Sequence, residues 1–166
     1  MPDRIRVMRM GIARAFMGAG LLAFVSQAAA AQADPLIGTW KLNVAKSSYT
    51  PGPAPKATTL TYTAASAGLK AVADGTPATG APTKVEFTIT YDGKDHPAKG
   101  SPDFDASAYQ KSDGYTTLFT RKKKGKVVQH GTRVLSKDLK TLTVTTDGTN
   151  ASGAKVHSVA VYEKQG

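Results

Sequence analysis

The sequence contains no cysteine, which excludes disulfide bonds, thiolate metal sites and cysteine nucleophiles. Glutamate is almost as scarce, since only Glu86 and Glu163 occur in 166 residues. No serine stands in a nucleophile-elbow motif, and no glycine-rich phosphate loop precedes a helix. We therefore expect no enzymatic activity, no cofactor and no metal, and an enzyme hypothesis rests only on the closeness of Asp95 and His96.

A long hydrophobic run is also missing. The apolar stretch over residues 15–31 is shorter than the roughly 20 residues that span a membrane. It lies between a basic start and the small-x-small pattern Ala31-Gln32-Ala33, which is typical of signal-peptide cleavage sites. The sequence predicts a signal peptide over 1–33, a periplasmic or secreted domain over 34–166, and no transmembrane anchor after cleavage. The basic start consists of Arg4, Arg6, Arg9 and Arg14.

The remaining chain has the length of one domain and is too short for a TIM barrel. Its hydrophobicity alternates with a period of two. In the clearest case Val85, Phe87 and Ile89 share one face while Glu86 and Thr88 share the other. This pattern predicts strands at about 37–43, 58–64, 68–73, 84–91, 106–111, 115–122, 126–136, 139–146 and 154–163, with a short tenth near 96–99.

Turn residues separate these strands. Asp-Gly pairs favour hairpin turns, so we expect turns at Asp74-Gly75, Asp92-Gly93, Asp113-Gly114 and Asp147-Gly148. The proline-rich segment 49–55 predicts an extended crossing outside the sheet centre.

Successive strands joined by hairpins predict an all-β fold, an antiparallel up-and-down barrel of 8–10 strands. A two-sheet sandwich is the alternative. A membrane barrel is disfavoured because the second strand face carries Thr, Lys and Glu instead of an apolar band.

The first predicted strand begins Gly38-Thr39-Trp40-Lys41-Leu42-Asn43, which resembles the Gly-x-Trp opening of lipocalins and fatty-acid-binding proteins. The whole chain after residue 33 is similar to a group of secreted bacterial lipocalin-like (calycin-type) barrels. That similarity extends over 51–56, 91–95 and 131–138. The resemblance implies a barrel in which Trp40 closes one end beneath a cavity for a small ligand.

The last predicted strand, Val161-Tyr162-Glu163-Lys164, is similar to that of fatty-acid-binding proteins. Those proteins hold a carboxylate with Arg-x-Tyr, but Ala160 stands here at the arginine position. The resemblance therefore favours a barrel more than it favours fatty-acid binding.

A ligand-binding barrel is our first functional hypothesis, for a small apolar or amphipathic molecule. Plain core packing is the simpler explanation for the aromatic residues on the predicted inner faces, and an apolar pocket wall is the functional one. An inward-facing arginine would be a buried cation suited to a ligand carboxylate. The predicted ligand-binding residues are Tyr62, Phe87, Tyr91, Phe119, Arg133 and Tyr162.

The second hypothesis is an envelope interaction module that uses a basic outer surface around a packed barrel. The net charge is +10, and the densest cationic run is Arg121-Lys122-Lys123-Lys124-Gly125-Lys126 at a predicted hairpin tip. Such a run suits anionic envelope surfaces, but specific nucleic-acid binding would require interleaved aromatic residues. A calcium loop at Asp92 and Asp95, or a histidine site at His130 and His157, lacks the remaining ligands.

Overall fold

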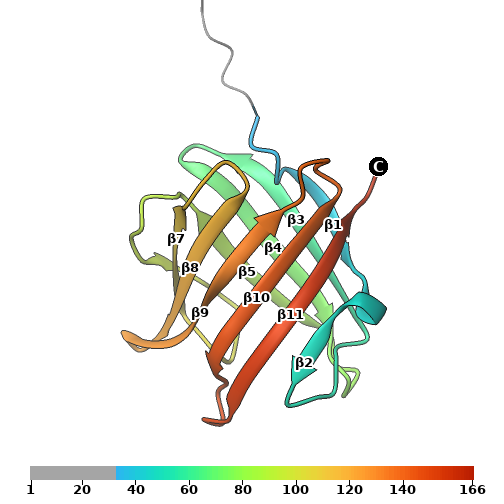
Figure 1. Ribbon diagram of the computed structural model, residues 1–166. Helices are drawn as coiled ribbons and strands as arrows, with labels where there is room; N and C mark the ends of the chain where they lie inside the picture. Colours follow the sequence, from blue (N-terminus) through green and yellow to red (C-terminus); the bar gives the residue numbers. More distant parts are fainter. Residues whose placement is uncertain (1–32) are drawn as a thin grey trace, which may run out of the picture. The chain divides into compact units, whose positions relative to one another are not determined.

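Strands make up most of residues 33–166, the part of the chain that the computed structural model describes (Figure 1). The only helical element in this part is a single 3-10 turn, η1 (Val44–Lys46). No helix here has the length and hydrophobicity that a membrane span requires. The strands are β1 (Gly38–Leu42), β2 (Ser48–Thr50), β3 (Ala57–Ala65), β4 (Gly68–Thr76), β5 (Thr83–Ile89), β6 (His96–Pro97), β7 (Ala106–Lys111), β8 (Thr116–Lys123), β9 (Lys126–Leu135), β10 (Thr141–Thr149) and β11 (Lys155–Lys164).

Ten of the strands form one antiparallel path in the order β5-β4-β3-β1-β11-β10-β9-β8-β7-β6, and β2 pairs separately with β11. Backbone hydrogen bonds join the two ends of this path. Glu86 and Lys99 exchange two bonds of 2.9 and 2.8 Å, and Gly93 N donates to Tyr109 O at 2.9 Å. The sheet therefore curls into a nearly closed barrel. The expected up-and-down barrel is confirmed, and the sandwich alternative is wrong.

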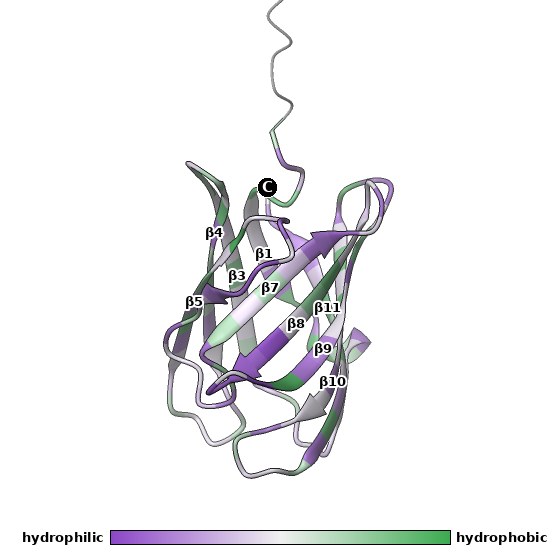
Figure 2. Ribbon diagram, turned by 90° about the vertical axis from the view of Figure 1, so that its left-hand side faces the viewer, coloured by the Kyte–Doolittle hydropathy of each residue, from purple (hydrophilic) through white to green (hydrophobic). Residues whose placement is uncertain are grey.

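The period of two places apolar side chains inside the barrel and polar ones outside. Phe87 and Ile89 are buried on β5, as are Leu142 and Val144 on β10. Hydrophilic and hydrophobic stretches accordingly alternate along the strands in Figure 2. Trp40 is 0% exposed, which agrees with its expected place at a barrel end.

Two of the four Asp-Gly turn predictions are wrong. Asp74-Gly75 lies inside β4, and Asp147-Gly148 lies inside β10. A Cβ on Gly148 would lie 2.1 Å from the Val128 carbonyl oxygen, so this glycine permits close approach of two strands. Asp92-Gly93 and Asp113-Gly114 do lie between strands, as expected.

The proline-rich segment differs in part from the prediction. Its first residues, Tyr49 and Thr50, belong to β2 and pair with Ser158 and His157 of β11. Residues 51–56 form no strand, as their prolines lead one to expect. The predicted signal peptide lies outside the described residues, except for Ala33.

Candidate functional site

A cavity of about 140 Å³ lies inside the barrel and is walled mainly by apolar side chains. We call it the inner cavity. Two cationic side chains, Arg121 of β8 and Arg133 of β9, reach it from neighbouring strands. The other residues that line it are Thr58, Leu60, Ala73, Val85, Phe87, Phe104, Val144 and Tyr162.

Arg133 is 3% exposed and points inward, as its place in the β9 alternation predicts. Its Nη1 donates a hydrogen bond to the Tyr62 hydroxyl, and its Nη2 donates to the Tyr109 hydroxyl at 3.4 Å. Its guanidinium carbon lies 5.1 Å from the centre of the Phe87 ring and 5.0 Å from that of Tyr109. Aromatic faces stabilise a cation at these distances, so Arg133 is held by neutral groups alone.

Arg121 also points inward, because it continues the inner face of β8 after Thr117 and Phe119. Its guanidinium carbon lies 4.5 Å from the ring centre of Phe104 and 4.7 Å from that of Phe119. Nη1 donates to Gln129 Oε1 at 2.9 Å.

The interpretation of residues 121–126 as one exposed basic patch is wrong at its first position, because Arg121 is inside the barrel. The next position is paired, since Lys122 Nζ lies 2.6 Å from Asp95 Oδ2. Lys123, Lys124 and Lys126 remain at the end of the β8–β9 hairpin.

The charges of the two arginines are not balanced within the described residues. Neither guanidinium lies within 4.0 Å of a described carboxylate. Burial raises the pKa of Tyr62 and of Tyr162, so both phenols stay neutral at neutral pH. Burial lowers the pKa of Arg121, but a guanidinium stays protonated in proteins. The cavity wall therefore carries two positive charges.

Three buried polar atoms of the described chain have no hydrogen-bond partner, and all belong to this region. They are Arg121 Nε, Arg133 Nε and Ser107 Oγ. Ser107 pairs with Arg121 across β7 and β8, so their side chains lie on the same inner face. Unsatisfied buried donors are rare in folded proteins, and they indicate a place where a ligand or an ordered water accepts hydrogen bonds.

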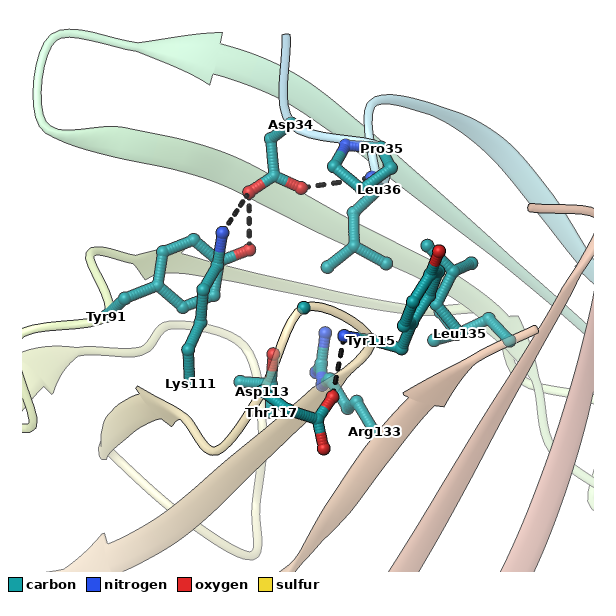
Figure 3. A pocket seen from close by; sticks show the side chains of 12 residues that line it. Asp34, Pro35, Leu36, Tyr91, Lys111, Asp113, Tyr115, Thr117, Arg133 and Leu135 are labelled. Carbon is teal, nitrogen blue, oxygen red and sulfur yellow. Dashed lines mark hydrogen bonds and ion pairs between the residues drawn. The ribbon is translucent and has the colours of Figure 1, made fainter. Parts of the chain in front are cut away.

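One end of the barrel is covered by residues 34–36, which we call the strap. Asp34 accepts a 2.7 Å hydrogen bond from the Tyr91 hydroxyl and lies 3.6 Å from Lys111 Nζ (Figure 3). Leu36 is buried, and its carbonyl accepts a 2.8 Å bond from Trp40 Nε1. Beneath the strap only about 20 Å³ of space remains, beside Arg133. This end is closed by packing.

The opposite end carries a groove of about 230 Å³ between β2, the start of β11 and Asp103. We call it the rim groove. Arg121 lines both this groove and the inner cavity, so the two spaces adjoin at its side chain. Asp103 Oδ1 accepts a 2.8 Å bond from Ala151 N, which ties the segment before β7 to the β10–β11 hairpin.

The structure brings five of the six predicted ligand-binding residues together inside the barrel. Arg133, Phe87 and Tyr162 line the inner cavity, while Tyr62 and Phe119 contact the arginines. Tyr91 lies at the strap instead, where burial and its bond to Asp34 raise its pKa. On β11, Ala160 occupies the position two residues before Tyr162 at which an Arg-x-Tyr pattern would place a cation. The cations of the inner cavity come instead from β8 and β9.

Sequence reasoning missed four residues of this site: Arg121, Ser107, Tyr109 and Phe104. The alternation Thr117-Phe119-Arg121 contains the signal for Arg121, which the neighbouring lysines obscured. Ser107 and Tyr109 alternate in the same way on β7. Phe104 comes before β7 in a segment without periodicity, and no sequence signal identifies it.

The remaining polar groups are explained by local structure. Asp92 accepts bonds from Lys94 N at 2.9 Å and Thr90 Oγ1 at 2.7 Å, and it lies 3.1 Å from His96 Nε2. His157 Nδ1 lies 2.6 Å from Asp147 Oδ1 in an exposed pair. Residues 33–166 contain no group of three or more His, Asp or Glu side chains placed to hold a metal ion.

No protein-family model matches the sequence, and a comparison with curated proteins found no match. Among solved structures, the chain is similar to the zebrafish ileal bile acid-binding protein complexed with cholic acid. The two chains share 11% sequence identity with a TM-score of 0.45, over 79% of this chain and 99% of the other. The fold described above follows from the strand pairing of this chain alone.

Proposed function

We propose that this protein binds a small amphipathic anion inside its barrel. One observation carries the proposal: the buried Arg133 and the partly buried Arg121 border an apolar cavity, and neither has an acidic partner among residues 33–166. An acid group would satisfy the free Nε donors of Arg121 and Arg133, and such charge-assisted hydrogen bonds are the strong ones. The apolar wall of the cavity would bury the rest of the ligand.

The size of the cavity limits the ligand. At about 140 Å³ it is smaller than the roughly 300 Å³ at which ligand pockets usually begin. The adjoining rim groove offers about 230 Å³ more on the far side of Arg121. We therefore expect a short chain or a small ring system, part of which extends toward the groove.

Calorimetric titration of the full chain with octanoate and with octanol tests the proposal. The two probes share a chain length, and only octanoate carries a charge. We expect octanoate to bind at least about tenfold more tightly than octanol, which corresponds to about 1.4 kcal/mol. Equal binding of both, or binding of neither, would contradict the proposal.

Two variants identify the site. Arg133→Met removes one buried cation, and we expect it to abolish the preference for octanoate. Lys126→Gln removes one exposed cation from the start of β9, and we expect unchanged binding. Unchanged binding in this matched control would show that the ligand binds at the interior site. Weaker binding would indicate the alternative, a basic outer surface formed by the lysines of the β8–β9 hairpin.

We also propose that the protein works in the periplasm or outside the cell, because of the leader-like residues 1–33. Expression of the full sequence in a bacterium, followed by fractionation and N-terminal sequencing, tests this. We expect a periplasmic or extracellular product that begins at Asp34. An uncleaved product in the cytosol would contradict it.

A further inference from the structure

The two arginines of the inner cavity converge on one place. The guanidinium carbons of Arg121 and Arg133 lie 4.7 and 5.8 Å from the centre of the same Phe119 ring. Gly131 pairs with Phe119 across β8 and β9 and lies between Gln129 and Arg133 on the inner face. A Cβ on Gly131 would lie 2.7 Å from Phe119 Cζ, so the Phe119 ring lies over this glycine, and the two arginines reach the ring from the levels on either side.

The Tyr109 hydroxyl accepts a hydrogen bond from Arg133 Nη2 at 3.4 Å. Both guanidinium groups line the same inner cavity of about 140 Å³. The two positive charges therefore surround one small volume. They repel each other there, as the effect of Arg133 in lowering the pKa of Arg121 shows.

A single carboxylate would neutralise only one of these charges. The other guanidinium would remain buried without a counter-charge, which is costly inside a protein. A phosphate monoester carries between −1.5 and −2 charges at neutral pH and presents three acceptor oxygens. The two arginines that line the cavity each have an unsatisfied Nε–H that can donate one hydrogen bond.

From this convergence we propose that the barrel prefers ligands whose single head group is doubly negative, such as an alkyl phosphate, over carboxylates of the same chain length. The proposal rests on the proposed function and specifies its ligand class. Arg121 then determines specificity, because a carboxylate satisfies Arg133 without it.

Calorimetric titration of the full chain with octyl phosphate, octanoate, inorganic phosphate and octanedioate tests the preference. At about pH 7.5 we expect octyl phosphate to bind at least about tenfold more tightly than octanoate. At about pH 5.5 the phosphate ester carries nearly a single charge, because its second pKa is about 6, and the preference should shrink several-fold. Both arginines keep their charge over this range.

Three variants test which side chains produce the preference for octyl phosphate over octanoate. Arg121→Gln should weaken octyl phosphate binding at least about tenfold and leave octanoate binding nearly unchanged. Ser107→Ala removes a buried hydroxyl that lines neither the inner cavity nor the rim groove, so it should leave both affinities nearly unchanged. Lys126→Gln should change neither affinity, which excludes a general effect of surface charge.

The outcomes separate the two proposals. Octanoate binding as tightly as octyl phosphate would overturn the dianion preference and leave the proposed function standing. Octanedioate binding more tightly than octyl phosphate would overturn the single-head arrangement, because it would place the two charges at separate points. Inorganic phosphate binding as tightly as octyl phosphate would support the dianion site and overturn the apolar part of the proposed function. Binding of none of the four probes would overturn both.

Discussion

At the scale of single residues, the two interior arginines are the feature that packing does not explain. Replacement of buried charged groups by apolar ones is often neutral or stabilising, because the desolvation of a charge exceeds what its contacts return. Arg133 is held by two phenols and several ring faces, and no carboxylate among the described residues approaches it. Such a side chain is better explained by ligand binding than by stability.

One substitution should therefore have opposite effects on stability and on binding. Arg133→Met should leave the free energy of unfolding of the ligand-free protein unchanged or raise it by up to about 2 kcal/mol. The same variant should lose octanoate binding. Urea denaturation monitored by circular dichroism measures the first effect. A loss of more than about 3 kcal/mol would show that Arg133 is primarily structural.

The packing around Phe119 leaves no room for a side chain at Gly131. A Cβ at this position would lie 1.9 Å from the Thr145 carbonyl oxygen and 2.7 Å from Phe119 Cζ. Gly131→Ala should therefore lower the free energy of unfolding by at least about 2 kcal/mol. Gly114→Ala is the matched control, because nothing lies within 4 Å of a Cβ there. Equal stability of the two variants in thermal unfolding would contradict this packing around Phe119.

At the scale of elements, the strands and the barrel architecture could be predicted from the sequence, but the contacts that close the barrel could not. Alternation along Val85-Phe87-Ile89 depends only on neighbouring positions, so it identifies β5 directly. Closure depends on a bridge between Glu86 and Lys99, which no local pattern encodes. Asp147-Gly148 was misleading for a related reason. Its glycine is selected by the close approach of Val128, a contact distant in sequence.

The candidate site could likewise be predicted only where it depends on the pattern within one strand. The inward direction of Arg133 follows from the alternation of β9, and the aromatic faces follow from their own strands. That Arg121 and Arg133 meet at one ring depends on the register between β8 and β9, which places the Phe119 ring over Gly131. Ser107 joins them through a register on the other side of β8. Register across strands is fixed by the whole barrel, so the convergence was not predictable from one strand at a time.

The connection between β5 and β6 has a testable acid sensitivity. Hydrogen bonds from Lys94 N and Thr90 Oγ1 to Asp92 lower the pKa of this carboxyl to about 2. A lowered pKa in the folded state adds stability above the unfolded pKa of about 4, and this stability is lost as the pH falls toward 2.

Asp92→Asn tests whether the ionised carboxylate of Asp92 stabilises the folded protein. The wild-type protein should be more stable than the variant above about pH 5, and the difference should shrink between about pH 4 and pH 2. Thermal unfolding of both proteins across this range measures it. A difference that stays constant down to pH 2, or grows as the pH falls, would show that Asp92 does not stabilise the connection through its charge.

At the scale of the whole molecule, the barrel has two unlike ends. Trp40 and the strap, which includes Leu36, fill one end. The other end carries the rim groove beside Arg121. The inner cavity lies between these ends with both arginines on its wall. This arrangement places the cationic centre within reach of a ligand from the groove and shields it from solvent at the strap.

The central claim is that an anion binds between Arg121 and Arg133. These are the only arginines in residues 33–166, so their Nε–H signals can be resolved in a proton–nitrogen correlation spectrum and assigned with the Arg121→Gln and Arg133→Met variants. Octyl phosphate should shift both signals in a saturable manner, because each Nε–H gains an acceptor, and octanoate should shift the signal of Arg133. Signals that stay unmoved at millimolar concentrations of both probes would contradict this claim.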